Sequence, residues 1–242
     1  MKALEPLKVQ LWRGANRLTS LVPPPPFGGR PGIQKKVFIV CSNPVGSSFS
    51  NAIADSAEKG LLASGHLIRR INLYSMPSEV GGGEFRSLLS TDERQSYFQE
   101  NNQPQLRQDK HVEHVVESLK WCDSLVLVYP TWWFNIPAIL KGFFDRCFVP
   151  GVGFKYDPEL GQRTTGLKNI EQVAVITTYG FSWLEVMKAG DAGRRMISGG
   201  MRMLFAPLCT LKWLGLYEMQ SAQPREVRTE FLEEVEQAFK EW

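Results

Sequence analysis

The segment 42–50 combines hydroxyl groups with the start of a helical pattern. It reads Ser-Asn-Pro-Val-Gly-Ser-Ser-Phe-Ser, and apolar residues follow at helical spacing as far as Leu61. Serine hydroxyls and the free amides of a first helical turn hydrogen-bond to an anion, and the helix dipole favours negative charge there. The segment is therefore a candidate phosphate cradle, although an ordinary serine N-cap would use the same residues. The chain contains neither GxGxxG nor GxxxxGK[ST], which argues against a dinucleotide fingerprint and a P-loop.

A second segment, 130–137, places three adjacent aromatic residues between two prolines. It reads Pro-Thr-Trp-Trp-Phe-Asn-Ile-Pro and directly follows an apolar run at 124–129. Successive side chains of an extended loop point in different directions, so at least one ring should form a wall for a flat aromatic ligand. A hydrophobic plug or a subunit contact is the alternative. A third segment, 177–180 (Thr-Thr-Tyr-Gly), adds hydroxyls and a glycine that permits close backbone approach, although a plain turn would also explain it.

Strand and helix patterns alternate from residue 36 onward and would position these segments. We expect strands at 37–41, 67–74, 124–129, 172–177 and 210–217, and helices at 49–61, 112–119, 137–148, 196–204 and 231–242. The stretch 75–108 should be a long excursion with some helix. Alternating elements predict a doubly wound parallel sheet with helices on both faces. Ligands bind such sheets at the carboxyl ends of the strands, near the topological switch point, where all three segments fall.

The first 35 residues differ in character from the remainder. Residues 1–34 hold five basic residues and one acidic residue, and leucines at helical spacing precede four prolines at 23–26. The proline run predicts a polyproline spacer. We therefore expect a basic N-terminal extension at 1–35 and one folded domain at 36–242. An organelle transit peptide and a helix packed on the domain or on a second subunit both explain the extension.

Composition excludes several classes of protein. The 242 residues are 43% hydrophobic and 22% charged, which is typical of a soluble globular chain, and no apolar run approaches the roughly 18 residues of a membrane-spanning helix. Beyond the extension the charges nearly balance, which disfavours nucleic acid as a partner. The four cysteines form no CxxC pair, so we expect no metal site and a reducing compartment, the cytoplasm. Import into mitochondria or another organelle is the alternative that the basic extension leaves open.

The residues from Tyr129 to Phe148 carry a family resemblance. They read Tyr-Pro-Thr-Trp-Trp-Phe-Asn-Ile-Pro-Ala-Ile-Leu-Lys-Gly-Phe-Phe-Asp-Arg-Cys-Phe and closely resemble the signature segment of the flavodoxin-like NAD(P)H:quinone oxidoreductases, the DT-diaphorase-like flavin reductases. The segments 153–156 (Gly-Phe-Lys-Tyr) and 177–180 also fit, and the resemblance runs from about Lys36 to Tyr217. It implies an α/β, flavodoxin-like, three-layer α/β/α fold whose five-stranded parallel sheet has the order 2-1-3-4-5.

The resemblance also implies roles for individual residues. The first loop would bind the flavin phosphates, the aromatic loop would hold the isoalloxazine, and the loop at 177–180 would meet its pyrimidine edge. Asp145 matches an acidic position near the adenosine end of FAD, whereas Phe154 and Tyr156 match aromatic residues of a shared substrate and dimer pocket. The implied cofactor-binding residues are Ser42, Ser47, Ser48, Phe49, Pro130, Thr131, Trp132, Trp133, Phe134, Asn135, Asp145, Thr177, Thr178, Tyr179 and Gly180.

Two departures from the family pattern concern histidines. The first loop of the family often begins with His, whereas Cys41-Ser42 stands here, and better-known members place a Tyr and a His after the fourth strand to stabilise the reduced flavin. The histidines of this chain are His66, His111 and His114, all upstream of that strand. Backbone amides or the Tyr179 hydroxyl would have to act instead, which makes Tyr179 the candidate catalytic residue.

The implied activity is hydride transfer from NAD(P)H through a bound flavin to a quinone or a similar flat electrophile, in a homodimer. FAD is favoured over FMN. The second hypothesis is a flavodoxin-type electron carrier or a regulatory flavin-binding subunit of a transporter. The third hypothesis is a relative that has lost its flavin. The near-neutral charge of the domain and its long excursion favour the enzyme.

Overall fold

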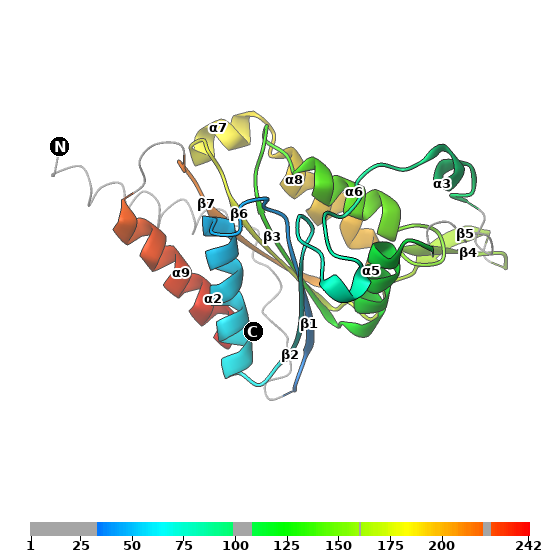
Figure 1. Cartoon of the computed structure of the whole chain (residues 1–242), viewed down its shortest axis with the longest axis horizontal. Helices are drawn as coiled ribbons and strands as arrows, with labels where there is room; N and C mark the ends of the chain where they lie inside the picture. The colour runs from blue at the N-terminus through cyan, green and yellow to red at the C-terminus, as the bar shows by residue number, and fades with distance from the viewer. Residues whose placement is uncertain (1–32, 99–107, 160, 220–223) are drawn as a thin grey trace.

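The computed structural model describes residues 33–98, 108–159, 161–219 and 224–242, so the predictions for residues 1–32 lie outside the described residues. Its centre is a parallel sheet with the strand order β2-β1-β3-β6-β7, as Figure 1 shows. The strands are β1 (Lys36–Cys41), β2 (Leu67–Asn72), β3 (Ser124–Pro130), β6 (Gln172–Thr178) and β7 (Thr210–Leu216). Counted within the sheet, this is the predicted order 2-1-3-4-5, and the predicted fold is confirmed.

Helices cover both faces of the sheet and complete three layers (Figure 1). On one face, α2 (Phe49–Ala63) and α9 (Arg225–Lys240) pack on alternate apolar residues of the strands. These two helices approach so closely that a Cβ on Gly60 would lie 2.3 Å from the carbonyl oxygen of Glu236. On the other face, α5 (Lys110–Trp121) and α6 (Ala138–Cys147) cover the larger apolar cluster.

The predicted excursion contains little regular structure in its described part. It holds the 3₁₀ turn η2 (Ser78–Val80) and the short helix α3 (Thr91–Gln95). The buried guanidinium of Arg146 on α6 ties it down, because Nη2 lies 2.6 Å from Oε1 of Glu93 and 2.7 Å from Oδ2 of Asp109. A buried pair of this kind fixes position more than it adds stability.

Three features of the second half depart from the predicted elements. The segment after α6 forms an antiparallel hairpin of β4 (Phe154–Asp157) and β5 (Gln162–Thr165), which lies beside the main sheet. The short helices α7 (Trp183–Lys188) and α8 (Ala192–Arg195) follow β6. The predicted helix 196–204 is a π-helical turn, η3 (Met196–Met201), followed by the 3₁₀ turn η4 (Arg202–Leu204). Throughout the described ranges, every helix is too short or too polar to cross a membrane.

Candidate functional site

The three predicted loops meet at the carboxyl edge of the sheet because β1, β3 and β6 are neighbours in it. The amide of Ser42 donates to Val128 O at 3.0 Å, which joins the residue after β1 to the last part of β3. The amide of Thr131 donates to Thr178 O at 2.8 Å. The hydroxyls of Thr131 and Thr177 are 2.9 Å apart and share a hydrogen bond. The structure therefore brings together three segments that are far apart in the sequence.

The aromatic loop is a tight turn with unusual backbone angles. The amide of Trp132 donates to Asn135 O and the amide of Asn135 donates to Trp132 O, both at 3.0 Å. Between them, Trp133 and Phe134 have φ values of 50° and 59°. Two successive positive φ values make a type I′ turn, which normally uses Asn and Gly. Bulky side chains in this conformation cost about 1–2 kcal/mol each, and such strain is concentrated at functional sites.

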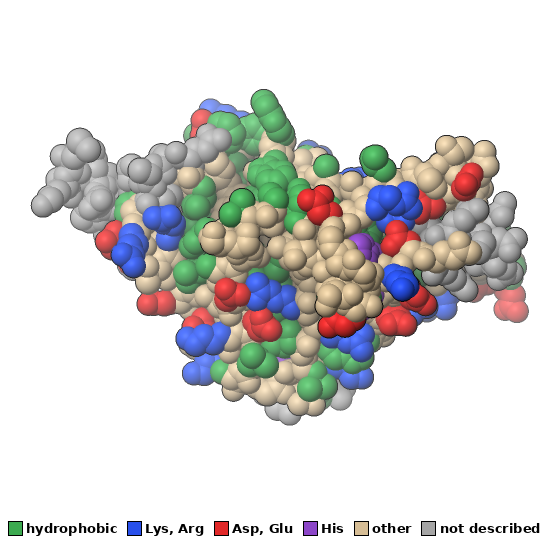
Figure 2. Space-filling model, in the orientation of Figure 1, with side chains coloured by type: hydrophobic (Ala, Val, Ile, Leu, Met, Phe, Trp, Pro, Cys, Tyr) green, Lys and Arg blue, Asp and Glu red, His purple; other side chains and the backbone are tan. Residues whose placement is uncertain are grey.

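The turn presents one ring to solvent and packs another. Trp133 is 93% exposed and Trp132 is 40% exposed. The ring of Phe134 stacks on that of Phe181, with centroids 4.8 Å apart and planes 21° apart. Figure 2 shows hydrophobic side chains gathered at the end of the molecule where the carboxyl ends of the strands lie. An exposed indole on a strained turn has no packing role within the chain, which favours a contact with a ligand or a second subunit.

The first loop has free hydrogen-bonding capacity directed at the start of α2. Ser48 is the N-cap, and its hydroxyl accepts from the amide of Asn51 at 3.3 Å, while Ser47 is exposed beside it. The Ser42 hydroxyl is buried and has no hydrogen-bond partner among the described residues. First-turn amides of a helix lack acceptors inside it. A phosphate fits this chemistry, because it would accept from the hydroxyls and amides together.

Phe49 serves the core as well as the loop. Its ring is half-buried and lies 6.5 Å from the ring of Phe231 on α9. The side-chain amide of Asn51 donates to Val45 O at 3.0 Å and to Gly46 O at 2.9 Å, so the loop is held in one shape before any ligand arrives. This pre-organisation lowers the entropy lost on binding.

The side chain of Tyr179 points into the protein, away from the open edge. Its ring stacks on that of Tyr217, with centroids 4.5 Å apart and planes 3° apart. Its hydroxyl accepts from Trp213 Nε1 at 3.2 Å and lies 3.3 Å from both carboxylate oxygens of Asp191. Burial raises the pKa of Tyr179 well above its ordinary value, with the neighbouring Tyr217 and Asp191 adding to the effect.

Three predicted site residues lie away from these loops along the chain. Asp145 is on the exposed side of α6 and pairs with Lys141 one turn earlier. Phe154 lies on β4 under the guanidinium of Arg163, which is 5.2 Å from its ring centroid. Tyr156 lies two residues further on the same strand and is 55% exposed. The structure of one chain does not bring these residues together with the carboxyl edge.

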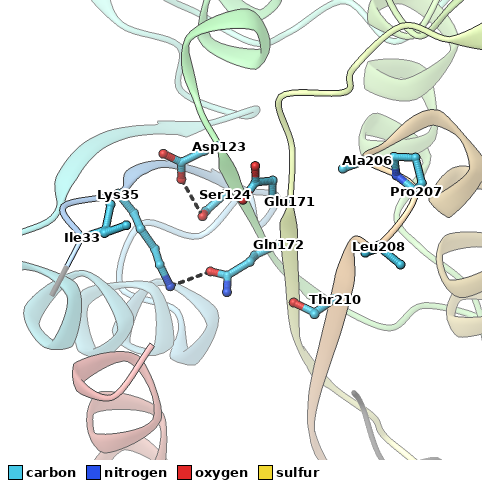
Figure 3. Close-up of a pocket in the computed structure, with 10 residues that line it drawn as sticks. All are labelled: Ile33, Lys35, Asp123, Ser124, Glu171, Gln172, Ala206, Pro207, Leu208 and Thr210. Carbon is cyan, nitrogen blue, oxygen red and sulfur yellow. Dashed lines mark hydrogen bonds between the residues drawn. The ribbon is translucent and has the colours of Figure 1, made fainter. Parts of the chain in front are cut away.

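A cavity of about 740 Å³ opens at the opposite, amino edge of the sheet. Its lining includes the residues where three strands begin, Ser124, Gln172 and Thr210. Figure 3 shows the full set, which is Ile33, Lys35, Asp123, Ser124, Glu171, Gln172, Ala206, Pro207, Leu208 and Thr210. The Lys35 ammonium donates to Gln172 Oε1 and to Trp242 O, both at 2.7 Å. None of the three predicted loops contributes to this lining.

Sequence reasoning missed Asp191, Trp213 and Tyr217, which surround the Tyr179 hydroxyl. Asp191 lies 12 residues after Tyr179 and follows a glycine in a stretch that reads as a turn. Its φ is 38°, so its backbone is also left-handed. The contact depends on how α7 folds back over β6 and β7, and local sequence carries no signal for it.

Comparisons with known proteins agree with this architecture. Residues 35–241 match a protein family described as flavodoxin-like fold. A ribosyldihydronicotinamide dehydrogenase-like protein of Penicillium crustosum is 30% identical over 187 residues, which cover 72% of this chain and 66% of that protein. An FMN-dependent NADH:quinone oxidoreductase of Desulfotalea psychrophila is 30% identical over 132 residues, which cover 53% of this chain and 60% of that protein.

A solved structure adds a match over nearly its whole length. The NAD(P)H:quinone oxidoreductase from Methanothermobacter marburgensis superposes with a TM-score of 0.69 at 26% identity, covering 86% of this chain and 98% of that one. The chain spans less than two thirds of the length of the two sequence relatives named above. The family resemblance read from residues 129–148 is confirmed by these matches.

Proposed function

This chain belongs to the family with the flavodoxin-like fold, and from that premise we propose that it is a flavin-dependent oxidoreductase. It would transfer hydride from NAD(P)H, through the bound flavin, to a quinone or a similar flat electrophile. The relatives named above are NAD(P)H and NADH oxidoreductases and a ribosyldihydronicotinamide dehydrogenase-like protein. Their names do not favour the alternative of an electron carrier or a transporter subunit.

The observation that carries this proposal is the union of three loops at one edge of the sheet. A polar cradle at the start of α2, a strained aromatic turn and the end of β6 lie side by side, joined by the Thr131–Thr178 and Ser42–Val128 hydrogen bonds. A molecule with a phosphate at one end and a flat ring at the other would match the polar cradle and the aromatic turn. Flavin nucleotides have that shape.

The residues present fit such a group in defined ways. The hydroxyls of Ser42, Ser47 and Ser48 would hold the phosphate. The turn at 131–135 would cover one side of the ring, and the backbone at 177–180 would face its edge. A bound flavin would supply two-electron redox chemistry, whereas the protein supplies orientation, hydrogen bonds and exclusion of water.

We propose FMN as the flavin, in place of the FAD that the sequence favours. The relative from Desulfotalea is FMN-dependent by name, and the FAD expectation rested on Asp145. That carboxylate is paired with Lys141 on an exposed face of α6. NADH and NADPH are both candidate hydride donors, and steady-state oxidation of each with a soluble quinone would distinguish them.

We propose further that the active unit is a homodimer. Trp133 and Leu184 are large exposed apolar residues at the carboxyl edge and on α7, and Tyr156 is exposed on the hairpin. A lone domain leaves this face open, whereas a second copy would cover it in an isologous two-fold contact. We also propose a reducing compartment, the cytoplasm, because all four cysteines are buried free thiols. The predicted import signal lies outside the described residues and stays a prediction.

The first experiment is an absorbance spectrum of the purified full chain, with identification of the flavin released on denaturation. We expect a yellow protein that releases FMN and oxidises NADH or NADPH when a soluble quinone is present. A flavin-bound protein without steady-state turnover would support the electron carrier. A colourless protein that takes up neither FMN nor FAD would contradict the proposal.

A further inference from the structure

Asp191 is a buried carboxylate in a conformation that the chain holds at a cost. It is 4% exposed, and its φ of 38° is left-handed. Neither feature benefits stability, because burying a charge and adopting positive φ without glycine are both unfavourable. A residue of this kind persists where the surrounding structure holds it for another purpose.

The hydrogen bonds around Asp191 run in one direction. An indole N–H can only donate, so Trp213 Nε1 donates to the Tyr179 hydroxyl oxygen at 3.2 Å. The phenolic proton is then directed at Asp191, whose two oxygens are each 3.3 Å away. The result is a chain from Trp213 through Tyr179 to a carboxylate, and Tyr179 is the residue whose backbone begins the loop after β6.

Asp191 is also close to the aromatic turn. Gly193, two residues later, packs so closely on that turn that an added Cβ would lie 3.3 Å from Ile136 and 3.6 Å from the carbonyl carbon of Asn135. Phe134 packs on the cluster that contains Tyr179 and Tyr217. Asp191 therefore lies close to both loops that would contact the flavin ring, the aromatic turn and the loop after β6.

We propose that Asp191 is a positioning residue that holds the loop after β6 through the Tyr179 hydroxyl, and that its buried charge lowers the reduction potential of a flavin bound there. The proposal rests on the proposed function. Negative charge near a ring that gains electrons opposes the gain, and low local dielectric strengthens the effect. Removing the charge should therefore favour the reduced flavin.

Several titratable groups lie close enough to Asp191 to interact with its charge. Tyr179 follows β6, Tyr217 follows β7, Tyr129 is the penultimate residue of β3, and Arg194 lies on α8. Burial raises the pKa of Asp191, whereas the Arg194 charge, an Arg194 backbone hydrogen bond and the Tyr179 hydrogen bond oppose that rise. The carboxylate thus becomes protonated at a higher pH than an exposed one, and the effect of its charge should fade as the solution is acidified.

The test is the reduction potential of the flavin bound to the full-length holoprotein, measured for Asp191→Asn against the wild type. Asn tolerates left-handed backbone and can still accept from Tyr179, so the substitution removes charge with little change of shape. The potential of the bound flavin depends on the ratio of two dissociation constants, that of oxidised flavin divided by that of reduced flavin. We expect this ratio to be about threefold or more higher in Asp191→Asn than in the wild type near pH 8, and the potentials of the two proteins to converge in acid. Glu218→Asn is the matched control, because Glu218 also has positive φ, at 64°, but is exposed.

A second measurement needs no flavin. Because the folded-state pKa of Asp191 is raised, the folded apoprotein binds more protons than the unfolded chain above the ordinary value of 3.8. The wild type should therefore lose stability relative to Asp191→Asn as pH rises through that window, and the variant should have the higher Tm at neutral pH.

The outcomes separate this inference from the proposed function. A protein that binds flavin normally, with the same potential in wild type and Asp191→Asn at every pH, would overturn the role of Asp191 alone. A protein that binds no flavin would overturn both. If Asp191→Asn failed to fold, Tyr179→Phe would serve, since it cuts the link to the loop; unchanged flavin affinity in that variant would refute the positioning role.

Discussion

The two edges of the central sheet differ in their backbone strain and in their hydrogen bonds. Every non-glycine residue with positive φ among the described residues, namely Trp133, Phe134, Asp191 and Glu218, lies in a connection that follows the carboxyl end of a strand. At the amino edge, by contrast, hydrogen bonds join the starts of the strands to other segments, although the Thr210 hydroxyl is buried without a partner among the described residues. Lys36 N donates to Asp123 Oδ2 at 3.0 Å, and the Lys35 ammonium has two acceptors.

This difference separates a site from a cavity. The amino edge holds the cavity of about 740 Å³. The hydrogen bonds there are structural, because the Lys35 side chain, just before β1, donates to Gln172 on β6 and to the carbonyl of Trp242. The carboxyl edge has an orphaned Ser42 hydroxyl and a solvent-exposed indole on a strained turn. Backbone strain and an exposed aromatic ring are therefore better guides to the chemistry of this fold than the size of a cavity, in keeping with the position of ligand sites in doubly wound sheets.

The largest expected effect comes from replacing Trp133 and Phe134 together by alanine. Ring stacking contributes about 0.5–1.5 kcal/mol per aromatic pair beyond the area that is buried. Two lost rings should therefore weaken flavin binding at least tenfold, measured by fluorescence titration of the apoprotein. Leu208→Ala is the control at the amino edge, where Leu208 is 88% exposed, and it should leave the affinity unchanged. Equal affinities in all three proteins would assign the rings to a subunit contact.

A single substitution sharpens the same point by separating strain from binding. Trp133→Gly keeps the turn, because glycine adopts positive φ without steric cost, and it removes an indole that buries almost nothing. We expect flavin affinity to fall about threefold to tenfold for one lost ring, while the Tm of the apoprotein does not fall. Lower stability together with unchanged affinity would show that Trp133 is a structural residue.

At the amino edge the expected effect is on stability alone. Lys35→Met leaves Gln172 Oε1 and Trp242 O without their donor, and an unsatisfied buried acceptor costs about 1–3 kcal/mol. Lys36→Met is the matched control, since Lys36 is exposed. Urea denaturation should show the loss for Lys35 only, with equal flavin affinity in both variants. Weaker flavin binding in Lys35→Met would show that the amino edge also influences the site at the carboxyl edge.

The sequence predicts the sheet well because its signals are local. Buried parallel strands are continuous apolar runs, such as Val37–Cys41 and Ser124–Tyr129, and each was found within one residue of its predicted bounds. The strand order also followed, since the family resemblance implied it and parallel crossovers leave few alternatives. Which loops meet was therefore predictable from the element pattern and the resemblance together.

The missing details are those in which tertiary contacts override local preference. Trp133 and Phe134 are poor residues for left-handed backbone, so no propensity rule predicts their turn. The hairpin 154–165 has no strong alternation, and the π-helical turn at 196–201 looks like ordinary helix in sequence. The inward direction of Tyr179 depends on Asp191 and Trp213, which reach it only once α7 and β7 are in place.

The smallest expected effect is a pH dependence at the amino edge. His66 is buried, and its Nδ1 accepts from the amide of Lys35 at 3.2 Å. Burial lowers the pKa of His66 below its ordinary value of 6.5, and the Lys35 charge lowers it further. Below pH 6.5 the unfolded chain therefore binds more protons than the folded one, so stability falls as pH decreases from 6.5 through the folded-state pKa.

His66→Asn tests this dependence, because the Asn side-chain oxygen can replace Nδ1 as the acceptor for Lys35 but does not titrate. We expect the variant to lose less stability than the wild type between pH 7 and pH 5, by about 1 kcal/mol or less, in urea denaturation of the apoprotein. Flavin affinity should have the same pH profile in both proteins, because His66 lies at the edge opposite the three loops. Parallel stability curves would show that His66 titrates alike in the folded and unfolded chains. A changed flavin profile would instead show that the amino edge is coupled to the site, and the functional division between the amino edge and the strained carboxyl edge would fail.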